Sequence, residues 1–132
     1  MSQAYRHGNT NVSLVNYHFV WCPRRRRRVI TGKLEQRLKT LIKEACDALD
    51  CVIIALETMP DHVHLFVNTP STIAPSILVG RIKGHSSKTL RDEFPVLQRM
   101  PSTWTRSYFV CTAGNISSGA VKRYIEAQKT RG

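Results

Sequence analysis

Alternating apolar residues predict the first secondary-structure element of this chain. The segment Asn11–Cys22 is rich in valine and aromatic residues with a period of two, which is typical of a β-strand. Tyr17, Phe19 and Trp21 share one face of this strand, and His18 lies on the other. The aromatic face fits either a platform on which DNA bases stack or core packing under a helix. We favour core packing, because a sheet buries at least one face.

Periodicity and turn residues predict the remaining elements. Apolar residues three and four positions apart indicate helices, and short apolar runs after turn residues indicate strands. In chain order, the expected elements are a helix over Lys33–Asp50, strands over Val52–Leu56 and His62–Asn68, a mostly helical segment over Pro70–Phe94, a strand over Arg106–Thr112, and a helix over Ser117–Lys129.

This order is βαββαβ followed by one helix, and it predicts an α+β fold with a ferredoxin-like (RRM-like) antiparallel sheet. The 132 residues and their hydrophobic fraction of 42% suit a single domain over residues 1–132. On this topology the strand His62–Asn68 is central. The final helix is then expected to pack against the exposed face of the sheet.

Two histidines on the central strand are the most informative residues. His62 and His64 are two positions apart, so their side chains project from the same face, while Val63 points to the other. Two imidazoles on one face supply half of a divalent-metal site. The alternative is a pair of histidines on a solvated sheet face.

A second group of chemically able residues lies in the final helix. Tyr124 and Gln128 are four residues apart, so they share a helical face. A tyrosine hydroxyl can serve as a covalent nucleophile, and the carbonyl oxygen of glutamine is a hard ligand suited to Mg²⁺ or Mn²⁺. The alternative is an amphipathic helix whose tyrosine only packs.

Together these two groups resemble the single-tyrosine (Y1) transposases of the IS200/IS605 type, which belong to the His-hydrophobe-His (HUH) endonuclease superfamily. The resemblance extends over Asn11–Gln128. Family members often carry Lys-Tyr-Arg where this chain has Arg24–Arg26. The residues that carry the resemblance are Tyr17–Cys22, Met59–His64, Lys83–Ser87, Trp104, Ser107–Val110, Thr112, Gly114, Tyr124, Ile125 and Gln128.

The resemblance implies a metal-dependent enzyme that cleaves and rejoins single-stranded DNA at insertion-sequence ends. By this resemblance, Tyr124 is the nucleophile that forms a 5′-phosphotyrosine intermediate. His62, His64 and Gln128 are the ligands of Mg²⁺ or Mn²⁺. The implied partners are a DNA hairpin at the element ends and a second copy of the chain. In such homodimers the tyrosine helix of one protomer can complete the other's site. Gly114–Gly119 is a candidate hinge for docking of the Tyr124 helix in cis or in trans, and a trans site is our hypothesis.

Net charge and arginine clustering predict the DNA contacts. Twenty basic and nine acidic residues give a net charge of +11, which suggests a polyanionic partner. Asp61 precedes the histidine pair and either orients a ligand from behind or only forms the turn. The candidate DNA-binding residues are Arg24, Arg25, Arg26, Arg27, Arg28, Lys83, Lys88 and Arg91.

The cysteines and the polar N-terminus indicate a cytoplasmic protein, nucleoid-associated when bound to DNA. The four cysteines form no Cys-x-x-Cys pair, so a zinc knuckle is not expected. A polar start over residues 1–10 argues against a signal peptide, and no apolar segment has the length of a membrane span.

Three other functions remain compatible with the residues. A relative specialised for repetitive palindromic elements would share the chemistry. A non-catalytic RRM-like module would bind nucleic acid without using Tyr124, and a hydrolytic nuclease would use water in its place.

Overall fold

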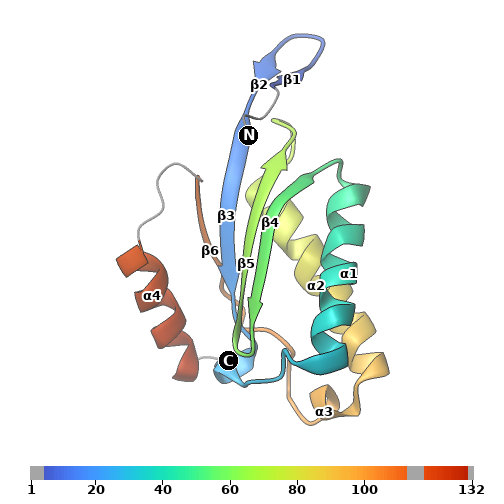
Figure 1. The fold of residues 1–132 in the computed structure, drawn as a ribbon, viewed down its shortest axis with the longest axis vertical. Helices are drawn as coiled ribbons and strands as arrows, with labels where there is room; N and C mark the ends of the chain where they lie inside the picture. Colours follow the sequence, from blue (N-terminus) through green and yellow to red (C-terminus); the bar gives the residue numbers. More distant parts are fainter. Residues whose placement is uncertain (1–4, 113–117, 131–132) are drawn as a thin grey trace.

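The computed structural model describes residues 5–112 and 118–130 of the chain, and Figure 1 shows their arrangement. The elements are β1 (Arg6–His7), β2 (Val12–Ser13), β3 (Val15–Trp21), the 3₁₀ turn η1 (Arg24–Arg26), α1 (Gly32–Ala48), β4 (Val52–Met59), β5 (His62–Thr69), α2 (Pro75–Glu93), α3 (Pro95–Gln98), β6 (Phe109–Thr112), α4 (Ser118–Ala127) and the 3₁₀ turn η3 (Gln128–Thr130).

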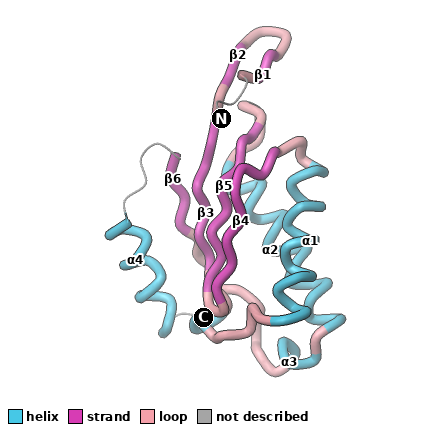
Figure 2. The backbone as a smooth tube through the Cα atoms, viewed as in Figure 1, coloured by secondary structure: helices cyan, strands magenta, loops and turns pink. Residues whose placement is uncertain are grey.

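Four strands form one antiparallel sheet in the order β4-β5-β3-β6 (Figure 2). Strands β3 and β5 are therefore central, and β4 and β6 are the edges. This order is that of a ferredoxin-like βαββαβ unit. The predicted α+β fold is confirmed, with α4 as the additional C-terminal helix.

The two faces of the sheet are covered by different helices. Helices α1 and α2 lie on one side, and α4 lies on the other (Figure 1). The side chains of Phe19 and Trp21 are fully buried in the core under α1 and α2, together with Val63 and Leu65 of β5. Core packing is therefore confirmed for the aromatic face of β3.

Several predicted boundaries differ from the structure, and three of the differences have a local cause or consequence. The first strand is divided into β2 and β3, with Leu14 between them. The helix after residue 70 begins only at Pro75, because proline is favoured in the first turn of a helix. Strand β6 begins at Phe109 and not at Arg106. The carbonyl oxygens of Thr105 and Ser107 accept hydrogen bonds from Lys83 Nζ, at 2.7 and 3.0 Å, in place of bonds to a neighbouring strand. Residues 114–117 of the proposed hinge lie outside the described residues.

Within the described residues, no helix has both the length and the apolar character needed to cross a membrane.

The core contact between α1 and the sheet predicts a large loss of stability on truncation. Ile42 of α1 is fully buried, so Ile42→Ala is expected to lower the free energy of unfolding by about 2–5 kcal/mol. Ile77 of α2 is 53% exposed, and the same change there is expected to alter it by less than about 0.5 kcal/mol. Urea unfolding followed by circular dichroism measures both. Equal losses in the two variants would contradict this assignment of the core.

Candidate active site

Strand β5 places its two histidines side by side on the face covered by α4. The ring centroids of His62 and His64 are 5.0 Å apart, with an interplanar angle of 77°. A metal–nitrogen bond of about 2.1 Å puts each ring centroid roughly 3.2 Å from a shared ion. Two such rings at a roughly tetrahedral angle would be about 5 Å apart. The observed separation therefore fits two ligands of one ion.

A buried carboxylate holds the ring of His62. Asp61 Oδ1 lies 2.7 Å from His62 Nδ1, and Asp61 Oδ2 accepts a hydrogen bond of 2.8 Å from Arg26 Nε. Burial alone would raise the pKa of Asp61, but the hydrogen bonds from His62 and Arg26 outweigh it and lower the pKa. An ionised Asp61 accepts a hydrogen bond from Nδ1–H, so in the neutral imidazole of His62 the lone pair is on Nε2, where a cation can bind.

A second histidine holds the ring of His64. His18 Nε2 of β3 lies 3.1 Å from His64 Nδ1, and the two rings are nearly parallel. His18 is only 2% exposed, and its ring stacks on Phe66 at a centroid distance of 4.2 Å. The Nδ1 atoms of both candidate ligands are thus engaged by other side chains, and both Nε2 atoms are left available.

Burial also keeps the imidazoles of His64 and His18 uncharged. Burial, together with the neighbouring His62 and His18, lowers the pKa of His64 to about 4. Burial likewise lowers the pKa of His18, against a smaller opposing effect of Glu57. Near neutral pH, His64 is therefore neutral, which is the form that binds a metal ion.

Helix α4 and the segment before β6 hold the predicted nucleophile. Ser107 Oγ donates a hydrogen bond of 3.1 Å to Gln128 Oε1, and it lies 3.1 Å from the hydroxyl oxygen of Tyr124. A serine hydroxyl has one proton, so Tyr124 donates in the second contact. Gln128 Nε2 also donates to the carbonyl oxygen of Tyr124, at 2.9 Å. Ser107 therefore joins the two residues that the helical spacing placed on one face.

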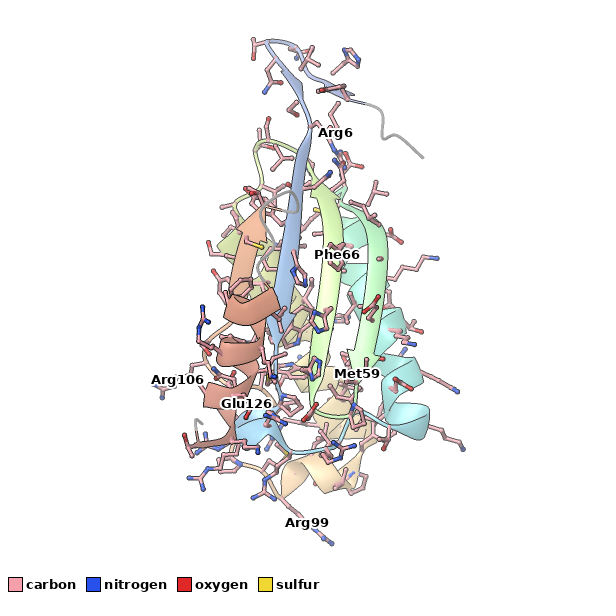
Figure 3. The ribbon with its side chains drawn as sticks, turned by 60° about the vertical axis from the view of Figure 1, so that its left-hand side comes forward. Arg6, Met59, Phe66, Arg99, Arg106 and Glu126 are labelled. Atoms are coloured by element: carbon pink, nitrogen blue, oxygen red, sulfur yellow. The ribbon has the colours of Figure 1, made fainter. Side chains whose placement is uncertain are left out.

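A cavity of about 410 Å³ separates the histidine face from α4. His18, His64 and Phe66 line it from the sheet, and Val121 and Ile125 line it from α4. Figure 3 shows α4, which carries Glu126, lying over the sheet face that carries Phe66. The predicted residues therefore form two groups, His62 with His64 on the sheet and Tyr124 with Gln128 at the covering helix, and His64 is the one of the four that lines the described cavity.

The predicted metal ligands include no charged side chain. Among the described residues, no group of three or more histidine, cysteine or acidic side chains is placed to hold a metal ion. The predicted set counts only two histidines and takes its third ligand from the neutral amide of Gln128. Gln128 is 1% exposed, and one lone pair of its Oε1 remains beyond the bond from Ser107.

The predicted DNA-binding residues differ in their surroundings. Arg25, Arg27, Arg28 and Lys88 are exposed. Arg24 is half-buried and lies 3.4 Å from Ser102 Oγ. Lys83 and Arg91 belong to α2, on the face opposite α4, and burial lowers the pKa of Lys83 to about 8. The side chain of Arg26 is 18% exposed and turns towards Asp61.

Three residues that contact the candidate ligands or nucleophile were given no such role from the sequence. His18 of β3 shares a sheet face with the histidine pair of β5, and the alternation along its strand was a usable signal for its position. Arg26 was one of five consecutive arginines, which gave no reason to separate it from its neighbours. The contact of Ser107 with Tyr124 could not be read from the sequence, because the two residues belong to different elements and no helix or strand periodicity relates them.

Comparisons with known proteins agree with the geometry. The family model described as "Transposase IS200 like" matches residues 11–128. The chain is 30% identical over 125 residues to the ISDra2 transposase TnpA of Deinococcus radiodurans, which covers 92% of this chain and 89% of that protein. It is 29% identical over 115 residues to the transposase for insertion sequence element IS200 of Salmonella typhimurium, with coverages of 85% and 75%.

Two solved structures share the fold of this chain. The crystal structure of a Deinococcus radiodurans R1 protein assigned as a transposase has a TM-score of 0.84 and 26% identity, and covers 93% of this chain and 97% of that one. A REP-associated tyrosine transposase bound to a REP hairpin shares the fold, with a TM-score of 0.60 and 16% identity over 96% of this chain and 69% of that one.

The buried histidines predict a loss of stability in mild acid. The pKa of His64 is about 4 in the folded protein and about 6.5 in the unfolded chain. The unfolded state therefore binds more protons between these values, so stability falls as the pH decreases from 6.5 towards 4. We expect the urea midpoint in EDTA to be lower at pH 5 than at pH 7.5, and to fall less in His64→Asn. His7→Asn, on exposed β1, is the control and should fall as much as the wild type. An equal fall in His64→Asn would contradict the assignment.

Proposed function

Because this chain belongs to the family of IS200-like transposases, we propose that it cleaves and rejoins single-stranded DNA at the ends of an insertion sequence. The observation that carries the proposal is that the helix with Tyr124 covers the sheet face of the two histidines. Asp61 and His18 contact the Nδ1 atoms of His62 and His64, and His64 faces Val121 and Ile125 of that helix across a cavity.

His62, His64 and Gln128 would hold Mg²⁺ or Mn²⁺. The imidazole nitrogens and the amide oxygen are all neutral, so a bound dication would keep its full charge towards an anionic substrate. When bound, such an ion neutralises charge on the scissile phosphate and orients it for in-line attack. The support for this ligand set is the 5.0 Å separation of the histidine rings and the free lone pair of Gln128 Oε1.

Tyr124 is the proposed nucleophile. Its oxygen forms a bond to phosphorus as the bond from phosphorus to the 3′ oxygen breaks. The tyrosine proton leaves, and the 3′ oxygen gains a proton to become a free hydroxyl. The product is a 5′-phosphotyrosine. One phosphoester bond, to the tyrosine oxygen, replaces the one that was broken, to the 3′ oxygen. A 3′ hydroxyl from another strand can therefore reverse the step and join the DNA without ATP.

Ser107 is the hydrogen-bond acceptor for the hydroxyl proton of Tyr124. The Tyr124 hydroxyl donates to Ser107 Oγ, which in turn donates to Gln128 Oε1. The hydroxyl proton therefore points towards Ser107. The lone pairs of the tyrosine oxygen, which must face phosphorus during attack, point in other directions.

The proposed substrate is single-stranded DNA with a hairpin at the element end. A net charge of +11 favours binding to a polyanion, and the exposed arginines lie in the η1 turn (Arg25) and directly after it (Arg27 and Arg28). A protein of the same fold was solved bound to a REP hairpin. Support from that protein is limited to the fold.

Removal of one hydroxyl group tests the nucleophile. We expect Tyr124→Phe to abolish the covalent protein–DNA adduct that forms on single-stranded DNA carrying the element ends, while DNA affinity stays within about twofold of the wild type. The adduct is measured on a denaturing gel with Mg²⁺ or Mn²⁺, and EDTA should also abolish it. Tyr108→Phe, which removes the hydroxyl of another half-buried tyrosine, is the matched control and should form the adduct.

The same gel distinguishes the other functions. A hydrolytic nuclease would cut the DNA without an adduct and would keep cutting as Tyr124→Phe. A non-catalytic binding module would shift the DNA and yield neither product nor adduct in any metal. Either result with wild-type protein on DNA of the correct ends would overturn the proposal.

A mixing experiment tests whether the protein acts as a homodimer with sites completed in trans. In such a dimer, a His64→Ala protomer can lend its Tyr124 to a Tyr124→Phe protomer, which supplies intact histidines. Equal mixing should recover roughly a quarter of wild-type cleavage, since half of the dimers are mixed and each has one complete site. Each variant alone serves as the control and should be inactive. No recovery after confirmed subunit exchange would show that the sites form in cis.

A further inference from the structure

The backbone of the η1 turn directs one arginine inward. Arg25 and Arg26 have φ angles of 54° and 56°, a left-handed conformation that residues other than glycine rarely adopt. Hydrogen bonds fix the turn, from Arg24 N to the Thr103 carbonyl oxygen at 2.9 Å and from Arg26 N to that of Pro23 at 2.8 Å. A strained turn that is held this firmly gives its side chains defined directions.

The guanidinium of Arg26 joins two elements of the site. Its Nε donates to Asp61 Oδ2 at 2.8 Å, and the other oxygen of that carboxylate contacts His62 Nδ1 at 2.7 Å. Its Nη1 lies 3.7 Å from Glu126 Oε1 on α4. The helix that carries Tyr124 and the strand that carries His62 therefore meet at one side chain.

Burial distinguishes Arg26 from its neighbours. Its side chain is 18% exposed and that of Asp61 is 8% exposed, whereas Arg25, Arg27 and Arg28 are exposed. A phosphate group would have to displace Asp61 to reach Arg26 Nε. Since that carboxylate also orients His62, the displacement would disturb a candidate ligand. The same contacts therefore favour an internal role over a DNA contact.

We propose that Arg26 is a positioning residue that orients the candidate metal ligand His62 through Asp61 and links that orientation to α4 through Glu126. The inference rests on the proposed function, because it assigns His62 a metal-binding role. Without Arg26, the carboxylate of Asp61 would lose one of its two fixed contacts and could rotate. His62 Nε2 would then no longer be held in one direction.

Metal affinity of the DNA-free protein tests the role of Arg26. Loss of an outer hydrogen-bonding partner lowers metal affinity by about 10- to 100-fold. We expect that loss for Mn²⁺ in Arg26→Ala, by isothermal titration calorimetry, and a partial recovery in Arg26→Lys, which restores one donor. Arg25→Ala is the matched control, because it changes the adjacent arginine in the same backbone conformation. Its Mn²⁺ affinity should equal that of the wild type.

DNA affinity in EDTA separates positioning from phosphate contact. We expect Arg26→Ala to bind single-stranded DNA as the wild type does, with the same dependence on salt concentration. A weaker affinity with a shallower salt dependence, together with unchanged Mn²⁺ binding, would make Arg26 a phosphate contact and overturn the inference.

A double-mutant cycle tests whether Arg26 acts through Asp61. Asp61→Asn keeps the shape of the side chain but no longer accepts the second hydrogen bond from Arg26. If the two residues act in series, Arg26→Ala should lower Mn²⁺ affinity by less than twofold in the Asp61→Asn background. Independent, multiplying losses would contradict the series. Circular dichroism confirms that each variant is folded.

The contact with α4 has its own test. If Glu126 completes the link, Glu126→Gln should lower adduct formation at saturating Mn²⁺ severalfold while Mn²⁺ affinity stays within twofold of the wild type. Glu93→Gln, which alters an acidic residue paired with Arg37 on the opposite face, is the control. Equal adduct formation in Glu126→Gln and the wild type would remove α4 from the proposal.

The titrations also distinguish this inference from the proposed function. If His62→Ala abolishes Mn²⁺ binding and Arg26→Ala leaves it unchanged, the metal site stands and the role of Arg26 is wrong. If the wild-type protein itself binds no Mn²⁺, both the metal site and the role of Arg26 are overturned.

Discussion

The antiparallel register between β3 and β5 determines both the core and the candidate active site. Trp21 lies opposite Val63 on the face under α1 and α2, and Val20 lies opposite His64 on the face under α4. Because side chains alternate with a period of two, a slip of one residue would exchange the two faces. The buried apolar side chains oppose such a slip. The packing that stabilises the fold therefore also fixes where the histidines project.

Strand β5 supplies the histidines, but contacts from elsewhere fix their rings. Arg26 reaches Asp61 from the η1 turn, and His18 reaches His64 from β3. Ser107, from the segment before β6, plays the same part for Tyr124. The candidate catalytic and metal-binding side chains are thus oriented by residues that are distant in sequence.

Local patterns in the sequence predicted the fold and the faces, because both follow from short-range periodicity. The period of two placed His62 and His64 together, and the period of 3.6 placed Tyr124 with Gln128. The inward turn of Arg26 could not be predicted, since five identical arginines carry no pattern and the turn depends on a left-handed backbone. The contacts of Ser107 depend on how α4 docks on the sheet. That docking is a property of the tertiary structure, and no spacing along the chain records it.

The hydrogen bond between His18 and His64 determines which ring nitrogen of His64 carries its proton. Burial lowers the pKa of both rings, so each is neutral and has one N–H. A lone pair on His64 Nε2 requires that His64 donate from Nδ1 and that His18 carry its proton on Nδ1. In the reverse arrangement, His18 donates from Nε2 and His64 Nε2 carries the proton. Among the described residues His18 Nδ1 has no hydrogen-bond partner, so it is an unpaired donor in the first case and an unpaired acceptor in the second. Leaving such a buried group unpaired costs about 1–3 kcal/mol in either case. The protein therefore does not strongly favour either arrangement, and a cation at His64 can select the one that binds it at little cost in stability.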